Sequence, residues 1–108
     1  MSMVLPRPVA AFFAAEREGD VKALGRCFTA DAEVRDEGRT MKGIPAIKKW
    51  HLAAKEKYHH TVLPIGVVER GGKTVVLATV AGDFPGSPLN LEHIFGLRGR
   101  KIASLTIG

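Results

Sequence analysis

A histidine in a row of apolar side chains is the first feature of the sequence that could do chemistry. The segment 89–98 reads Leu-Asn-Leu-Glu-His-Ile-Phe-Gly-Leu-Arg. The period of two in a strand places His93 on the same face as Leu91, Phe95 and Leu97. One interpretation is a core histidine that is hydrogen-bonded to a hydroxyl or a carbonyl group. The other is an acid, a base or a hydrogen-bond donor at the floor of a pocket, where burial disfavours the charged ring.

A carboxylate, Asp36, ends the short alternating segment 32–36 and is the second candidate. It shares a face with Val34, which is apolar and expected to be buried. A carboxylate in such a place can act as a general base. The alternative is that Asp36-Glu37-Gly38 is only a turn in which the aspartate caps its own backbone. Asp31 and Asp83 are interpreted as cap or turn residues.

Aromatic residues come from several separate segments of the chain. If they converge they line an apolar cavity, and if they do not they fill the core. His51 and His60 are further candidates for such a cavity, because His51 follows Trp50 and the face of His60 is not fixed by the pattern. The aromatic residues in question are Phe12, Phe13, Trp50, Tyr58, Phe84 and Phe95.

Several common kinds of active site are missing from the sequence. It contains no glycine-rich phosphate loop, no HExxH, no CxxC and no GxSxG motif, so nucleotide hydrolysis, zinc hydrolysis, dithiol redox chemistry and ordinary serine hydrolysis have no support. The adjacent His59 and His60 point to different faces, and His51 and His93 have no partner at a ligand spacing. We therefore expect neither a metal nor a cofactor.

Length and composition predict one ordinary domain over residues 1–108. Of these residues 45% are hydrophobic and 25% are charged, which suffices for a core without disulfides. The single cysteine, Cys27, and the lack of a leader-like pattern in Met1–Ala10 predict a reducing, cytoplasmic location. No apolar run is long enough for a membrane span. The net charge of +5 is spread along the chain, which does not indicate nucleic-acid binding.

The first half of the chain has the periodicity of helices. Pro6 and Pro8 suit a first turn, and Val9, Phe12, Phe13 and Glu16 then follow at helical spacing until Gly19 interrupts the pattern. A second short helix is predicted from an Asp20 N-cap to about Thr29-Ala30. A third is predicted from Ile44 to about Tyr58, with Gly43 before it and Pro45 tolerated in its first turn.

Strands account for most of the remaining sequence. A small strand is predicted at Ala32–Asp36, with Glu37-Gly38-Arg39 as a turn, and the period changes to two after Tyr58. Gly71-Gly72, Pro85-Gly86 and Gly99 supply the turns between later strands. The predicted class is α+β, with helices covering the apolar face of an antiparallel sheet. The four later strands are predicted at His60–Arg70, Lys73–Asp83, Leu89–Arg98 and Lys101–Ile107.

Three stretches together resemble a known family. They are Gly19-Asp20 followed by residues 28–36, the segment 42–50 (Lys-Gly-Ile-Pro-Ala-Ile-Lys-Lys-Trp), and the closing strands around Phe95-x-Leu97 and Leu105-x-Ile107. In this order they resemble the SnoaL-like and ketosteroid-isomerase-like proteins of the nuclear-transport-factor-2-like superfamily, which have a cystatin-like fold. The resemblance covers nearly the whole chain. It implies a cone, α-α-β-α-β-β-β-β, in which a curved antiparallel sheet wraps around three helices and encloses an apolar pocket.

The resemblance also implies roles for individual residues. Asp36 matches the catalytic carboxylate of the isomerases, which moves a proton on the substrate, and His93 falls where they place a protonated acid in the oxyanion hole. Phe12 stands where those enzymes have a tyrosine donor, so steroid isomerisation itself is not expected. Trp50 matches an aromatic residue that lines the pocket. Dimerisation through the exposed face of the sheet is implied as well.

Three functions remain open at the level of sequence. The first is a cofactor-free enzyme in which Asp36 is the base and His93 the donor for proton transfer next to the carbonyl of a small apolar compound. Phe12, Trp50, Tyr58 and Phe95 would shape its cavity. The second is a module that binds a small apolar ligand in the same cavity without turnover. The third is a homodimeric scaffold that associates through the sheet face, since one fold serves many functions.

Overall fold

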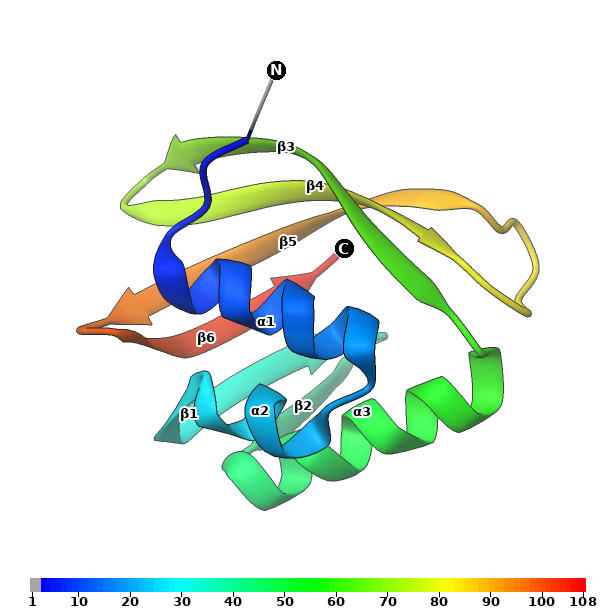
Figure 1. Cartoon of the computed structure of the whole chain (residues 1–108), viewed down its shortest axis with the longest axis horizontal. Coiled ribbons are helices and arrows are strands. Elements are labelled where there is room, and N and C mark those ends of the chain that lie inside the picture. Colours follow the sequence, from blue (N-terminus) through cyan, green and yellow to red (C-terminus); the bar gives the residue numbers. More distant parts are fainter. Residues whose placement is uncertain (1–2) are drawn as a thin grey trace.

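The structure is a computed structural model and describes residues 3–108. These residues form three helices and six strands, and Figure 1 shows their arrangement. Met1 and Ser2, from the segment considered above for a leader, lie outside the described residues. In chain order the elements are α1 (Arg7–Glu18), α2 (Val21–Arg26), β1 (Phe28–Asp36), β2 (Arg39–Lys42), α3 (Ile44–Tyr58), β3 (Thr61–Arg70), β4 (Lys73–Ala81), β5 (Leu89–Arg98) and β6 (Lys101–Ile107).

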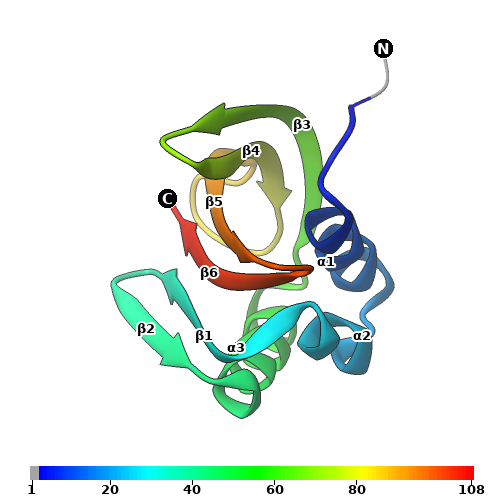
Figure 2. The same ribbon diagram turned by 90° about the vertical axis from the view of Figure 1, so that its left-hand side faces the viewer.

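The strands form one curved, unclosed sheet, and the class is α+β as predicted. The order across the sheet is β2-β1-β6-β5-β4-β3. Neighbouring strands are antiparallel except β1 and β6, which run parallel. Figure 2 shows how strongly the strands curl, with α1 and α3 on the inner side of the curve. Long-range pairing of β1 with β6 thus joins the first half of the chain to the end of the sheet.

The residues predicted to end, cap or turn the chain do so in the structure. The backbone N–H of Gly19, in the left-handed region at φ 69°, closes the end of α1, a conformation that glycine adopts without strain. The side chain of Asp20 accepts a hydrogen bond of 3.0 Å from the N–H of Ala23 and so caps α2. The hairpin between β3 and β4 turns on Gly71 and Gly72, both with positive φ, which a primed two-residue turn requires.

Two boundaries differ from the prediction because tertiary pairing overrides local propensity. The second helix ends at Arg26, and residues 28–30, predicted as the end of that helix, begin β1 instead. There Phe28 pairs with Ile102 of β6, and the N–H of Ile102 donates to the carbonyl of Cys27. The residues after the Glu37-Gly38 turn form a further strand, β2, which the sequence reading left unassigned. The four later strands lie within two residues of their predicted limits.

The core lies between α1 and the concave face of the sheet. Phe12 contacts Phe13, Phe28 and Phe95 edge-on, with ring centroids 5.2–6.0 Å apart. Phe95 is fully buried, and such aromatic pairs add to the stabilisation from apolar burial. None of the helices in residues 3–108 is long and apolar enough to cross a membrane.

Replacing Phe95 with alanine tests this aromatic core. We expect the free energy of unfolding to fall by about 3–5 kcal/mol, because the variant loses a fully buried ring and leaves a void. Urea denaturation followed by circular dichroism measures the change. Leu97→Ala on the same strand is the control and should cost much less, since Leu97 is 37% exposed. Equal losses in the two variants would contradict the assignment of Phe95 to the centre of the core.

Candidate active site

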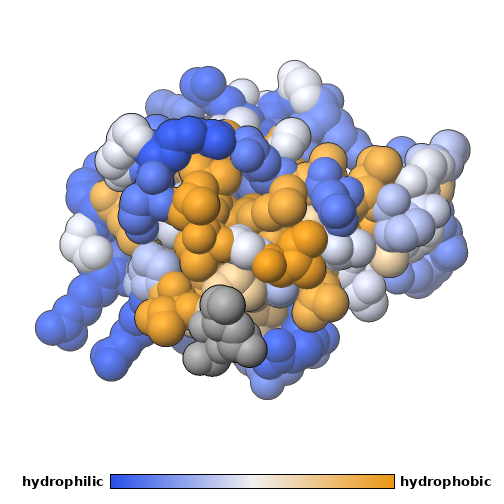
Figure 3. All heavy atoms as spheres, turned by 90° about the horizontal axis from the view of Figure 1, so that it is seen from above, coloured by the Kyte–Doolittle hydropathy of each residue, from blue (hydrophilic) through white to orange (hydrophobic). Residues whose placement is uncertain are grey.

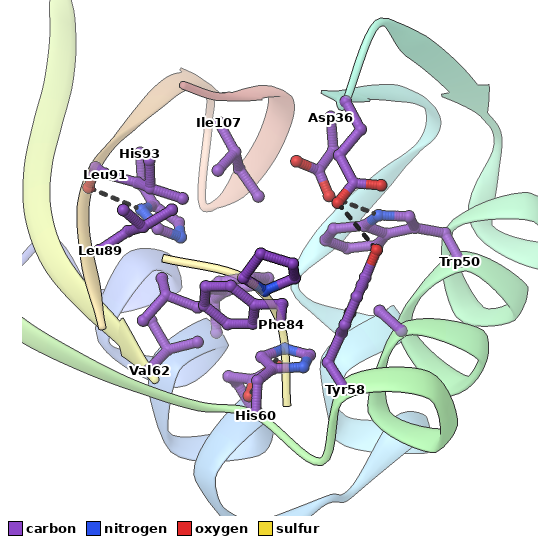
Figure 4. Close-up of a pocket in the computed structure, with 16 residues that line it drawn as sticks. Asp36, Trp50, Tyr58, His60, Val62, Phe84, Leu89, Leu91, His93 and Ile107 are labelled. Carbon is purple, nitrogen blue, oxygen red and sulfur yellow. Dashed lines mark hydrogen bonds and ion pairs between the residues drawn. The ribbon is translucent and has the colours of Figure 1, made fainter. Parts of the chain in front are cut away.

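A cavity of about 360 Å³ opens between the helices and the concave face of the sheet. Its walls come from α1, α3, the end of β1, and the inner faces of β3, β4, β5 and β6, and the loop 82–88 closes one side (Figure 4). Most of the lining is apolar. The polar groups are few and lie at separate points of the wall, an arrangement typical of small-molecule sites.

Asp36 lies on this wall at the last position of β1. Strand alternation turns it inward together with the buried Val34, as the sequence predicted. The indole Nε1–H of Trp50 donates a hydrogen bond of 3.1 Å to its Oδ2. Burial raises the pKa of Asp36, and the bond from Trp50 opposes that rise only in part. The result is a half-buried carboxyl group that exchanges a proton more readily near neutral pH than an exposed aspartate does.

The turn that follows Asp36 supplies a second carboxylate. Glu37 adopts a left-handed conformation at φ 53° and Gly38 follows at 73°, so the chain reverses directly after β1. The hydroxyl of Tyr58, at the end of α3, donates a 3.2 Å hydrogen bond to Oε1 of Glu37. The polar hydrogens of Trp50 and Tyr58 are therefore donated to the two carboxylates, while both rings line the cavity (Figure 4).

His93 lies across the cavity on β5. Its ring is 2% exposed, stacks on Phe95 and packs against Phe13. Burial lowers its pKa to about 4, so the ring is neutral at pH 7. Nδ1 lies 3.3 Å from the carbonyl oxygen of Leu91. A nitrogen that faces a carbonyl oxygen must carry the proton, so Nε2 holds a lone pair. In this form His93 accepts a hydrogen bond, whereas the resemblance implied a donor.

The loop 82–88, which joins β4 to β5, is held against the end of α3 and forms one side of the cavity. The N–H of Asp83 donates to the carbonyl of Tyr58 at 2.7 Å, and the Ser87 hydroxyl accepts from Gly82. A side chain at Gly82 would collide with the backbone and Cβ of His60, so only glycine permits this close approach. Phe84 then reaches the cavity with its ring edge-on to Tyr58.

A buried charged group beside the cavity is centred on Glu16, which was not among the predicted site residues, and includes the candidates His51 and His60. His60 lines the cavity, whereas His51 contacts Glu16 without lining it. Glu16 is 3% exposed, forms an ion pair with the amine of Lys55, and lies 3.2 Å from Nδ1 of His51. Nε2 of His60 is 3.8 Å from Oε1 of Glu16. Burial alone would raise the pKa of Glu16, but the bonds from His51 and Lys55 outweigh it and lower that pKa. An ionised carboxylate thus lies in the wall of the cavity.

The sequence contained a signal for Glu16. It occupies the same helical face as Phe12 and Phe13, so a carboxylate stood on the side predicted to be buried. Buried carboxylates need partners, and those partners, on α3 and at the start of β3, are far away in the chain. Only the fold brings them together.

The other predicted residues divide between the cavity and its surroundings. Phe12, Trp50 and Tyr58 line the cavity, and His60 does so too. Phe95 is not among the lining residues; its ring lies in the core against Phe12 and Phe13. The reason is that Phe95 is two residues further along β5 than His93, toward the middle of α1. In residues 3–108 no three histidine, cysteine, aspartate or glutamate side chains are grouped to hold a metal ion.

The geometry suits proton transfer in an apolar cavity. A carboxyl group whose pKa is raised transfers protons more readily at neutral pH than an exposed aspartate does, and the imidazoles of His60 and His93, whose pKa values are lowered, are neutral beside it. A family model for the SnoaL-like domain matches residues 9–105. The chain belongs to the SnoaL-like domain family. No curated protein sequence matches it.

Solved structures agree with this membership. A SnoaL-like fold is shared with a proposed polyketide cyclase from Sinorhizobium meliloti, which is 38% identical over 96% of this chain and 95% of that one, with a TM-score of 0.93. A ketosteroid-isomerase-like protein from Catenulispora acidiphila, in complex with trimethylamine, is 25% identical over 97% and 86%, with a TM-score of 0.83. A cystatin-fold protein from Novosphingobium aromaticivorans, at 17% identity, shares the fold over 99% of both chains with a TM-score of 0.79.

The buried His93 should make the protein sensitive to acid. Between pH 6.5 and about 4 the unfolded chain binds a proton at His93 that the folded chain does not, so stability falls as the pH is lowered through this window. Across the whole window the free energy of unfolding falls by roughly 3 kcal/mol because of this one group. We expect His93→Gln to lose that part of the pH dependence in urea denaturation at pH 4.5 and 7. The exposed His59→Asn variant should keep it, and an unchanged slope in His93→Gln would contradict a neutral, buried ring.

Proposed function

We propose that this SnoaL-like protein binds a small apolar carbonyl compound and that Asp36 transfers a proton next to that carbonyl. The reaction class is isomerisation or cyclisation without a cofactor. His93, on the opposite wall, offers the lone pair on Nε2 to a hydroxyl group of the ligand, such as that of its enol form. Phe12, Trp50 and Tyr58 shape the space between them, with Phe95 supporting Phe12 from the core.

One observation carries this proposal: a carboxyl group is held on the wall of an apolar cavity by a single indole N–H. The Trp50 bond fixes the position of Oδ2, while Oδ1 stays available to a ligand. Burial raises the pKa of Asp36, which brings it closer to the working pH and makes it both a better base and a usable acid. The similarity to a proposed polyketide cyclase at 38% identity supports the same reaction class.

Ligand binding without turnover is the second candidate function. Asp36 and Glu37 lie beside the rings of Trp50 and Tyr58, and carboxylates among aromatic rings suit a small amine cation. The Catenulispora acidiphila relative was solved in complex with trimethylamine. In this case the cavity holds its ligand by charge and ring contacts, and no proton is moved.

Exchange of carbon-bound protons for deuterium distinguishes the two functions. For a cyclic enone or a beta-diketone in deuterium oxide, we expect the wild-type protein to speed exchange next to the carbonyl, measured by NMR. Asp36→Asn should lose about 100-fold or more of that rate. Its binding, followed by Trp50 fluorescence, should be nearly unchanged, because asparagine still accepts from the indole. Folding should be retained, since ionising Asp36 in the cavity opposes folding at neutral pH.

Asp31→Asn is the matched control, because this carboxylate lies on the same strand but is exposed and paired with Arg98. It should exchange protons at the wild-type rate. Undiminished exchange in Asp36→Asn would exclude Asp36 as the base. Saturable binding with no exchange in the wild-type protein would favour the second function.

We further propose that the protein forms a homodimer through the convex face of its sheet. Leu63 and Val68 on β3 and Leu77 on β4 are 64%, 57% and 38% exposed. Their registers place them on the side away from the cavity. Figure 3 shows hydrophobic side chains gathered on the face that includes β3, with hydrophilic ones around them. Exposed patches of this kind are typical of association sites.

Sedimentation velocity tests the dimer directly. The wild-type chain of 11.6 kDa should sediment as a dimer at micromolar concentration, and Leu77→Glu should sediment as a monomer because it places a charge in the apolar contact. Leu52→Glu is the control, as Leu52 is also exposed but lies on α3, away from this face. A monomeric wild-type protein would contradict the proposal.

A further inference from the structure

The hydrogen bonds around the cavity leave mainly acceptors for a ligand. Trp50 and Tyr58 already donate to Asp36 and Glu37, and Nδ1 of His93 faces the carbonyl of Leu91. One carboxylate oxygen of Asp36, one of Glu37 and the lone pair on Nε2 of His93 remain free. A ligand that fits this wall brings its own donor, such as the hydroxyl group of an enol or a phenol.

His60 lies where it could receive the proton of such a hydroxyl. Its ring lines the cavity below Asp36 in Figure 4 and stands edge-on to Tyr58. Nδ1 is buried near the carbonyl of Ala54 on α3 but forms no hydrogen bond within the described residues. Nε2 is the other ring nitrogen, and it lies 3.8 Å from Oε1 of Glu16.

The backbone of His60 is fixed from two directions. The amine of Lys55 donates a 2.5 Å hydrogen bond to the carbonyl of His60 and pairs with Glu16 at the same time. Gly82 packs directly against the Cα and Cβ of His60. This anchored backbone places the imidazole beside the ionised carboxylate of Glu16, which is the geometry of an acid–base pair.

We propose that His60, paired with Glu16, is a second proton-transfer residue of this cavity and takes the proton from a hydroxyl group of an enolic or phenolic ligand. The inference rests on the proposed function and names the ligand class for it. The ligand O–H bond breaks, its electron pair stays on the oxygen, and the proton binds Nε2 of His60. The new positive charge then lies next to the carboxylate of Glu16.

This step complements the one assigned to Asp36. When an enol returns to its carbonyl form, Asp36 in its neutral state gives a proton to carbon while His60 removes one from oxygen. Solvent then returns a proton from His60 to Asp36 after the ligand leaves. The reverse sequence is the enolisation described above, so both directions use the same two groups.

Charged neighbours set the protonation of the ring. Burial lowers the pKa of His60, the charge of Glu16 on α1 opposes this, and Lys55 and His51 on α3 lower it further. Asp36 on β1 is electrostatically coupled to the same ring. The free protein therefore holds His60 neutral at pH 7, ready to accept a proton.

Para-nitrophenol is a direct probe, because its phenol and phenolate forms differ in absorbance. Bound to the wild-type protein below its own pKa, it should show the phenolate spectrum. His60→Gln should bind about tenfold more weakly and hold the neutral phenol, since the amide cannot take the proton. His59→Asn, which changes the exposed neighbouring histidine, should keep the phenolate spectrum.

A measurement without ligand tests the pairing of His60 with Glu16. NMR titration of the His60 ring should give a lower pKa in Glu16→Gln than in the wild type, because the opposing charge is gone. If Glu16→Gln does not fold, the absorbance of bound para-nitrophenol in His60→Gln and His59→Asn still tests whether His60 takes the proton. A phenolate spectrum that persists in His60→Gln overturns this inference alone. Undiminished deuterium exchange in Asp36→Asn overturns the role of Asp36 alone, and a wild-type protein that binds no probe overturns both.

Discussion

The edge-on packing of Phe12 against Phe28 and Phe95 determines where the core ends and the cavity begins. These rings join α1 to the first strand and to the middle of the sheet, and they fill the space at one end of the concave face. Phe12 also lines the cavity, so one ring belongs to both regions. Beyond it, the sheet continues to curl, and the cavity lies between its concave face and residues of α1 and α3, so the curvature that closes the core also opens the pocket.

The cavity then changes the chemistry of every ionisable group on its wall. Because the surroundings are apolar, the charged form of each isolated group is disfavoured. Asp36 shifts toward its acid form, while His60 and His93 shift toward their neutral forms. Glu16 is the exception, because His51 and Lys55 satisfy its oxygens. The number of charged or hydrogen-bonding partners, more than the depth of burial, therefore separates the group that stays ionised from those that shift toward their neutral forms.

Local patterns in the sequence were enough for most of the fold. Proline and glycine at the ends of α1, the aspartate cap of α2 and the glycine turns act within a few residues, so their effects are readable from the chain. The start of β1 was not readable, since Phe28 becomes a strand residue only by pairing with Ile102. Asp36 was recognisable as inward-facing because strand alternation is local. The group around Glu16 was not, since its members come from three elements that only the fold brings together.

The Glu16 group also shows how stability and function are divided in this domain. An ionised carboxylate buried between two helices contributes little net stability, and apolar residues of similar size often stabilise such a position better. The aromatic core already supplies the contacts that hold α1 to the sheet. A charged group kept beside that core, on the wall of a cavity and next to an imidazole, is therefore better explained by proton transfer than by packing. Buried charged groups that reduce packing quality are expected at the functional site of a small domain.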